Sequence, residues 1–199
     1  RAALAAKSVE LVAVDSNPLD AVWDDQPAPS PAVAVVHPEE FTGRNSADKR
    51  AEIADWLSKE ELDATIITAL DSTAWLLNMR GSDVDRTPVA LAYAILNADA
   101  TVDLFIAEEK VTPDLVQHLG NAVRIHERSA FENGLDALKG KKVAVDSERA
   151  VAAIFDRLRT AGASISRHRD PTVLAKAVKN PVEMAGHRSA QARDGAALT

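Results

Sequence analysis

The sequence predicts an α/β fold, a three-layer α/β sandwich in which a mixed, roughly six-stranded sheet lies between helices. Short apolar strands alternate with helical segments across residues 44–176, a length that suits one domain. Residues 89–96 are apolar throughout, which is typical of a strand buried on both faces. A turn at 97–100 joins them to a strand at 102–106, and this antiparallel hairpin among βα units makes the sheet mixed.

The other elements of this domain follow from apolar spacing and from capping residues. The predicted strands are 64–68, 89–96, 102–106, 123–125, 143–145 and a last one around Ile165. The predicted helices begin at Ser46, at Asp71, at Thr112, at a capping box of Ser129 and Glu132, and at Val151. Trp75, Leu76 and Met79 are expected to be the packed side chains of the second helix.

The segment before this domain predicts a strand, a short helix and a linker. Residues 9–14 alternate as a strand does, and Asn17-Pro18 is a typical helix start. The apolar face of that helix would carry Leu19, Val22 and Trp23. Prolines recur between residues 24 and 38, so this run predicts a semi-rigid extended linker, and a docking peptide for a proline-recognising partner is the alternative.

After the domain, helices are predicted from Asp170 to Ala177 and from Asn180 onward. The first residues read as the tail of a helix and the last ones as a helix still in progress. We therefore interpret the sequence as a fragment of a longer protein.

The composition excludes several classes of protein. The chain has no cysteine, which excludes a disulfide scaffold, a zinc–thiolate site and a cysteine nucleophile, and fits a cytoplasmic location. Its net charge of -7 argues against binding nucleic acid through phosphates. No apolar run approaches the ~20 residues that span a membrane, so no membrane partner is expected.

No catalytic or metal-ligating residue is predicted in this chain. A two-metal site needs several convergent carboxylates together with histidine. The five histidines lie apart in the sequence, without a His-Glu-x-x-His motif, and each is interpreted as a surface residue. There is no Gly-x-Ser-x-Gly elbow and no glycine-rich phosphate loop, so neither a serine nucleophile nor a nucleotide cofactor is expected.

The candidate site is a polar loop that follows the strand 64–68 and the short helix after it. Loops at strand ends are where α/β folds place ligand contacts. The substrate-proximal candidates are Arg80, Asp83 and Arg86, which could offer charged hydrogen bonds, and Trp75. A structural interpretation remains open, in which Arg80 interacts with the helix carbonyls, Asp83 or Asp85 pairs with Arg80, and Trp75 is a core residue.

The same stretch resembles a known family. Residues 71–84 read Asp-Ser-Thr-Ala-Trp-Leu-Leu-Asn-Met-Arg-Gly-Ser-Asp-Val, which is similar to the middle domain of the three-domain Xaa-Pro aminopeptidases (aminopeptidase P), metallopeptidases with the creatinase fold. The resemblance implies that residues 1–43 are the end of a first creatinase-like N-terminal domain plus the linker. It makes 44–176 the second such domain and 177–199 the start of a catalytic pita-bread domain. The place of Arg86 is commonly a histidine in this family, so no role is carried over to Arg86.

The resemblance implies a parent protein that releases the N-terminal residue from peptides with proline in second place, using two divalent metal ions, typically manganese. Those ions would be held outside this chain, which would have no cofactor and no activity alone. This part would wall the substrate cleft, limit access to short proline-containing peptides, and support a homodimer. The alternatives are a stand-alone peptide- or protein-binding module without activity, and a scaffold that only dimerises. A metal-ligand set of Asp, Asp, His, Glu and Glu after Thr199 would support the enzyme.

Overall fold

The computed structural model describes Leu4, Lys7, Val9, Glu10, Val12, Val14 and residues 16–199. The chain divides into two compact units, Arg1–Ser30 and Pro31–Thr199, which are described separately. No helix among the described residues is long and apolar enough to cross a membrane.

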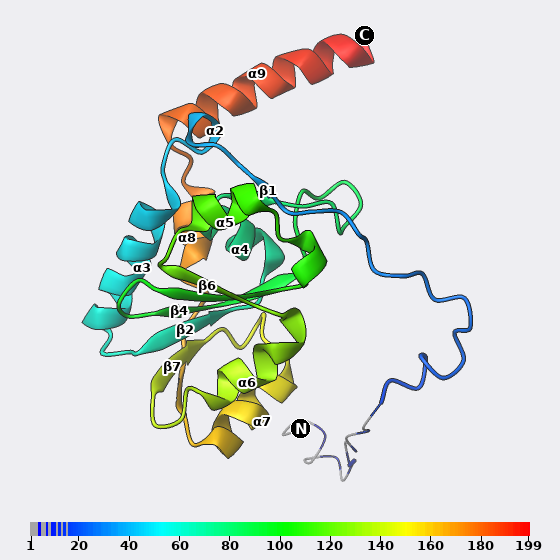
Figure 1. Cartoon of the computed structure of the whole chain (residues 1–199), viewed down its shortest axis with the longest axis vertical. Helices are drawn as coiled ribbons and strands as arrows, with labels where there is room; N and C mark the ends of the chain where they lie inside the picture. Colours follow the sequence, from blue (N-terminus) through cyan, green and yellow to red (C-terminus); the bar gives the residue numbers. More distant parts are fainter. Residues whose placement is uncertain (1–3, 5–6, 8, 11, 13, 15) are drawn as a thin grey trace. The chain divides into compact units, whose positions relative to one another are not determined.

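A six-stranded mixed sheet forms the centre of the second unit (Figure 1), as predicted. Its strands lie in the order β6-β5-β4-β2-β7-β8. They are β2 (Ala64–Ile67), β4 (Ala92–Asn97), β5 (Val102–Ile106), β6 (Val123–His126), β7 (Lys142–Val145) and β8 (Ser164–Arg167). β4 pairs antiparallel with both of its neighbours, and the remaining three pairs of strands are parallel. β4 therefore runs in the direction opposite to the other five strands. The carboxyl ends of those other strands therefore share one edge of the sheet.

Helices cover both faces of the sheet, which confirms the predicted sandwich (Figure 1). One layer holds α3 (Ser46–Lys59), α4 (Leu70–Leu76), α5 (Pro113–Leu119) and α8 (Thr172–Ala177), and the other holds α6 (Phe131–Asp136) and α7 (Ala152–Ala161). Successive side chains of β2 point to opposite faces. Ile67 packs in the cluster that contains Leu57, whereas Ile66 packs with Phe131 and Phe155.

Several predicted helix ends are confirmed, and one cap was assigned a residue too late. Thr112 caps α5 by accepting a hydrogen bond from the Leu115 amide at 3.2 Å, and Gly120 follows the helix. At α3 the cap is Asn45 rather than Ser46, because the Asn45 side chain accepts from the Asp48 amide at 2.8 Å. Asparagine and serine are both good caps, and the prediction named Ser46 without considering Asn45.

Three other local predictions were wrong. Met79 does not belong to the helix of Trp75 but to a two-residue strand, β3 (Met79–Arg80). Ser129 does not cap a helix, because a 3-10 turn, η2 (Arg128–Ala130), precedes α6 and no side chain caps that helix. The apolar run from Val89 enters the sheet only at Ala92, since Val89 and Ala90 are buried in the connection to it.

The β3 strand pairs antiparallel with β1 (Val35–Val36), which lies within the run 24–38 predicted as a linker, so the last part of that run belongs to the second unit. Two further short elements complete this unit, η1 (Glu108–Lys110) and α2 (Glu39–Thr42). The last helix, α9 (Pro181–Leu198), packs on α2 and extends away from the sheet (Figure 1).

In the first unit, the helix predicted from Asn17 is instead a series of turns. Asn17 does begin a turn, because its side chain accepts from the Leu19 amide at 3.1 Å. Leu19 and Val22 remain 65% and 75% exposed, so burial does not stabilise a helix there. The strand predicted over residues 9–14 falls in part on residues outside those described.

Candidate functional site

The candidate stretch begins with α4 and reverses at Asn78 into β3. Asn78 has φ +49°, a left-handed conformation that asparagine tolerates better than most residues. Its backbone oxygen accepts a hydrogen bond from the His37 amide at 2.8 Å, which joins the turn to the β1 side. This turn therefore places Arg80 beside α4 instead of prolonging the helix.

The Asn78 side chain is buried and holds three segments together. Its amide nitrogen donates to the Arg44 oxygen at 2.9 Å and to the Thr42 hydroxyl at 3.3 Å. Its amide oxygen accepts from Lys49 Nζ on α3 at 2.6 Å. Asn78 is 1% exposed, and its hydrogen-bonding capacity is met by protein groups.

Lys49 is a buried cation at the centre of this network. It is 2% exposed, donates to the Trp75 oxygen at 3.0 Å, and lies 4.5 Å from the Trp75 ring centroid. No carboxylate of the described residues lies within ion-pair distance of Lys49. Burial lowers the pKa of Lys49 to about 8, and the Arg80 charge adds to this while Glu183 opposes it. Trp75 is itself 8% exposed and so is a core side chain that faces this cation.

Arg80 lies next to this cation with its guanidinium partly dehydrated. Its Nη1 donates to the Ala74 oxygen at 3.1 Å and to the Met79 oxygen at 2.9 Å. Burial lowers the pKa of Arg80, and the Glu183 carboxylate opposes that shift. His37 feels the same surroundings, since burial and then the Arg80 charge lower its pKa. An anchored guanidinium of this kind is suited to bind a carboxylate or a carbonyl oxygen.

Asp83 is buried behind the loop. Its Oδ1 lies 2.7 Å from Lys110 Nζ, and these side chains are only 1% and 4% exposed. Its Oδ2 accepts from the Leu91 amide at 2.7 Å. Lys110 also donates to the Ala32 oxygen at 3.3 Å. This ion pair thus joins the loop to the segment before β1.

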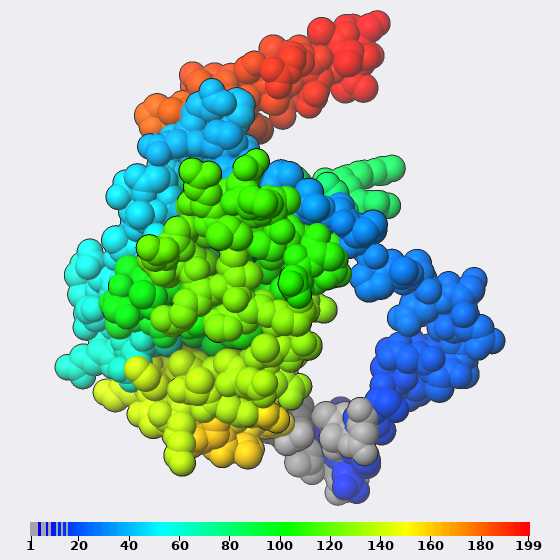
Figure 2. Space-filling view, viewed as in Figure 1, coloured from blue at the N-terminus to red at the C-terminus, as the bar shows by residue number. Residues whose placement is uncertain are grey.

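Arg86 lies on the exposed side of the same loop. Residues 84–88 are exposed, and this loop, in green, projects from the surface in Figure 2. Val84 and Thr87 form a bridge across the loop, and Arg86 between them has φ +61°. The structure therefore places Trp75 and Arg80 near Lys49, buries Asp83 against Lys110, and leaves Arg86 exposed on the loop.

Sequence reasoning missed Lys49 and Asn78, and one signal for Lys49 was available. Lys49, Ile53 and Leu57 are four residues apart, so they share the inward face of α3. Only the apolar members of that row were counted as core. For Asn78 the sequence gives only a weak signal, because its left-handed backbone conformation is seen only in the structure.

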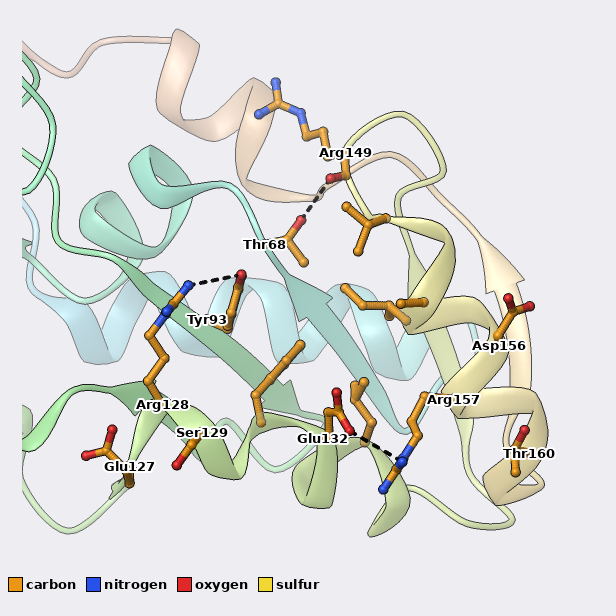
Figure 3. A pocket seen from close by; sticks show the side chains of 15 residues that line it. Thr68, Tyr93, Glu127, Arg128, Ser129, Glu132, Arg149, Asp156, Arg157 and Thr160 are labelled. Atoms are coloured by element: carbon orange, nitrogen blue, oxygen red, sulfur yellow. Dashed lines mark hydrogen bonds and ion pairs between the residues drawn. The ribbon is translucent and has the colours of Figure 1, made fainter. Parts of the chain in front are cut away.

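A hollow of about 950 Å³ lies at the sheet edge between α6 and α7 (Figure 3). The Tyr93 and Phe131 rings stack in it at 4.5 Å, and Arg128 donates to the Tyr93 hydroxyl at 3.4 Å. Arg157 lies 3.4 Å from Glu132 across the lower part of the view. Many of its polar groups thus pair with one another, and no nucleophile and base are paired among them.

The residues present do not form a metal centre. Across the described ranges, no three side chains of histidine, aspartate or glutamate converge in a way that could hold a metal ion. His126 is bound instead by Asp103, at 2.8 Å, and His118 contacts the Leu77 oxygen at 3.0 Å. A di-nuclear metal site does not fit the side chains that the structure describes.

The family model described as Creatinase/Prolidase N-terminal domain matches residues 25–183. This chain belongs to that family. The match includes β1, β3 and the first turn of α9, so the Asn78 network lies wholly within the creatinase/prolidase N-terminal region.

Curated relatives extend the comparison. A protein named "Probable Xaa-Pro aminopeptidase P" from Aspergillus clavatus is 37% identical over 94% of this chain and 30% of its own length. One with the same name from Leptosphaeria maculans is 33% identical over 97% of this chain and 33% of its own length. The chain therefore spans about a third of the relatives that it matches.

A solved structure covers nearly the whole chain. X-prolyl aminopeptidase from Caenorhabditis elegans, described as a cytosolic enzyme with a di-nuclear active site, superposes with a TM-score of 0.89 over 99% of this chain and 33% of its own, at 28% identity. Xaa-Pro dipeptidase from Bacillus anthracis superposes with a TM-score of 0.55 over 71% of this chain and 38% of its own, at 12% identity, which shows a shared fold alone. The creatinase/prolidase fold predicted from the sequence is thus confirmed.

Proposed function

We propose that this chain is the non-catalytic N-terminal part of a cytoplasmic, metal-dependent Xaa-Pro aminopeptidase. The similarity of 99% of the chain to the Caenorhabditis elegans enzyme carries the proposal. The parent would release the N-terminal residue from peptides with proline in second place. Because the side chains of the described residues do not fit a metal pair, the divalent ions, manganese in our proposal, would be held by a separate catalytic domain.

The domain boundaries belong to the same proposal. Residues 1–43 would end a first N-terminal domain, 44–176 would form the second, and 177–199 would lead into the catalytic domain. The direction of α9, which extends away from the sheet, supports this arrangement because it places the end of the chain away from the core.

Within the proposal, this part walls the substrate cleft and Arg80 faces the peptide. Arg80 is held by two backbone carbonyls next to the root of α9, where a following domain would begin. Arg86, on the projecting loop, would reach a peptide or a neighbouring subunit. Asp83 would act by fixing the loop through Lys110, and Trp75 by fixing α4, rather than by touching the peptide.

The deciding experiment is hydrolysis of an Xaa-Pro-Xaa peptide with added manganese, by this chain and by the same chain extended with the residues that follow it in its gene. Activity in the extended protein alone would support the proposal. Activity in this chain alone would mean that a metal site lies among the residues set aside above. No activity in either would favour a peptide- or protein-binding module.

Two further measurements address the cleft and the dimer. In an active extended protein, Arg80→Met should raise KM, whereas Arg159→Met, on the opposite face of the sheet, should leave KM unchanged. Analytical ultracentrifugation should detect a homodimer of the extended protein. A monomer with full activity would remove dimerisation from the proposal.

A further inference from the structure

The last helix, α9, leaves the domain without an apolar face to fix its direction. Its 18 residues include no buried one. Helices in globular proteins usually owe their orientation to a buried apolar stripe. The direction of α9 must therefore come from contacts at its first turn.

Asn180 makes the hydrogen bonds among those contacts. Its side-chain oxygen accepts from the Glu183 amide at 2.9 Å, and Glu183 accepts in return from the Asn180 amide at 3.0 Å, which forms a capping box. Its side-chain nitrogen donates to the Thr42 backbone oxygen, at the end of α2, at 2.7 Å. Asn180 thus begins the helix and attaches it to the domain with different atoms.

The attachment continues into the candidate site. Thr42 is 3% exposed, and its hydroxyl lies 3.3 Å from the Asn78 side chain, which Lys49 holds from the other side. Asn78 directly precedes the β3 strand that carries Arg80. One row of hydrogen bonds therefore joins the root of α9 to that strand.

The fit at this joint is close. Gly43 follows Thr42 with φ +62°, and a Cβ placed on it would lie 2.6 Å from Asn180 Oδ1 and 2.8 Å from Val182 Cβ. Only a residue without a side chain allows α9 to approach α2 this closely.

We propose that Asn180 and Asn78 are positioning residues: through Thr42 they hold α9 in a fixed direction relative to Arg80. On the proposed function, in which α9 leads into a catalytic domain, the same joint sets how that domain faces the Arg80 strand. The first statement concerns this chain alone and does not depend on the second.

The substitution that separates the two tasks of Asn180 is Asn180→Asp. Aspartate still caps the helix through an oxygen, but it has no N–H to donate to Thr42. In Asn180→Ser the serine hydroxyl oxygen can likewise cap the helix, and the side-chain N–H that reaches Thr42 is lost without adding a charge. Both variants should keep the helical content of the wild type by circular dichroism while releasing α9 from α2.

The direction of α9 can be measured by pulsed electron spin resonance between spin labels at Asp55→Cys on α3 and Gln191→Cys on α9. Both positions are exposed, and the chain has no cysteine of its own, so labelling is confined to these sites. Loss of one neutral hydrogen bond should raise the released population about fivefold. The inter-label distance distribution should broaden in Asn180→Asp, Asn180→Ser and Asn78→Ala. It should stay unchanged in Asn97→Ala, which removes a half-buried, hydrogen-bonded asparagine elsewhere in the sheet.

A wild-type distribution in both Asn180 variants would overturn the proposal, because other contacts would then fix α9. In an active extended protein, the same variants should raise KM more than they lower kcat, with no change in melting temperature. Broadened distances with unchanged kinetics would support the role of these residues in fixing α9 and exclude a role of that contact in catalysis by the extended protein. An inactive extended protein would count against the proposed function only.

Discussion

Replacing Lys49 by methionine should remove a pH dependence from the stability of this domain. Lys49 has a pKa of about 8 in the folded chain, against 10.5 for an ordinary lysine. Below about pH 8 both the folded and the unfolded chain hold the proton, and the folded state bears the full cost of the buried charge. Between pH 8 and 10.5 the folded chain releases the proton first, so the unfolded chain binds more protons and stability rises with pH.

The size of the effect follows from that shift. At ~1.4 kcal/mol per pKa unit, the full gain is ~3 kcal/mol near pH 10.5 and ~2 kcal/mol by pH 9.5. The side chain is 2% exposed, so solvent does little to reduce it. Lys49→Met should unfold in urea with a free energy that lacks this rise. The wild-type minus variant difference should therefore grow by ~2 kcal/mol between pH 7 and 9.5.

The matched control is Lys59→Met, an exposed lysine on the same helix. The free-energy difference between this variant and the wild type should stay constant over the same pH range, because its side chain lies in solvent. The difference between wild type and Lys49→Met cancels the titrating groups that Lys49 does not perturb. A flat difference for Lys49→Met would refute the reasoning, because it would mean that Lys49 ionises as it does in water.

Three other substitutions give expected losses, each measured by urea unfolding. Asp83→Asn leaves the Lys110 cation buried without its carboxylate and should cost ~3 kcal/mol at pH 7, whereas a loss under 1 kcal/mol would show that the pair contributes little. Burial raises the pKa of Asp103, but hydrogen bonds from Arg124 and His126 outweigh it and hold that pKa at about 2. The ionised Asp103 therefore contributes ~2 kcal/mol to stability at pH 6, and the wild type loses this contribution as the pH falls from about 4 to 2. Asp103→Asn should lack it at pH 6. Gly43→Ala should cost ~2 kcal/mol, because it combines a left-handed backbone with the clash at Asn180, and an unchanged midpoint would exclude that clash.

The sheet was predictable from the sequence because its strands carry their own signals. The residues of β2, β4 and β5 are short apolar runs, and the turn after Asn97 marks the hairpin. The order of the strands and the faces that the helices cover depend on contacts between distant segments. Those contacts leave no local pattern in the sequence. The three layers were therefore predicted, whereas the order and register of the strands were not.

The wrong local predictions share one physical cause. Met79 was placed on a helix because its spacing from Trp75 is helical, yet Asn78 adopts a left-handed conformation and ends the helix first. At Ser129 a good capping pattern was overridden by a 3-10 turn. In both places the spacing of a few residues did not show the backbone turn that the chain makes there.

In the candidate site, too, the sequence showed which residues are charged but not which contacts they make. Arg80 and Arg86 were found as charges in a loop, and the structure shows that one is anchored and the other projects. Asp83 and Lys110 lie 27 residues apart in the sequence, so their ion pair could not be read from spacing. The family resemblance selected this stretch, and its assignment as a site stays a prediction, whereas the contacts of its side chains follow only from the structure.

The buried Lys49 poses a question that stability alone does not answer. An apolar side chain in its place would avoid a charge cost of ~3 kcal/mol. However, the Asn78 side-chain oxygen and the Trp75 carbonyl both accept hydrogen bonds from Lys49, and a buried acceptor left without a donor costs ~1–3 kcal/mol. Because Asn78 holds a left-handed turn, those bonds fix the point where the chain turns into β3. The buried charge of Lys49 therefore destabilises the fold, but its hydrogen bonds fix the turn at Asn78 that positions Arg80.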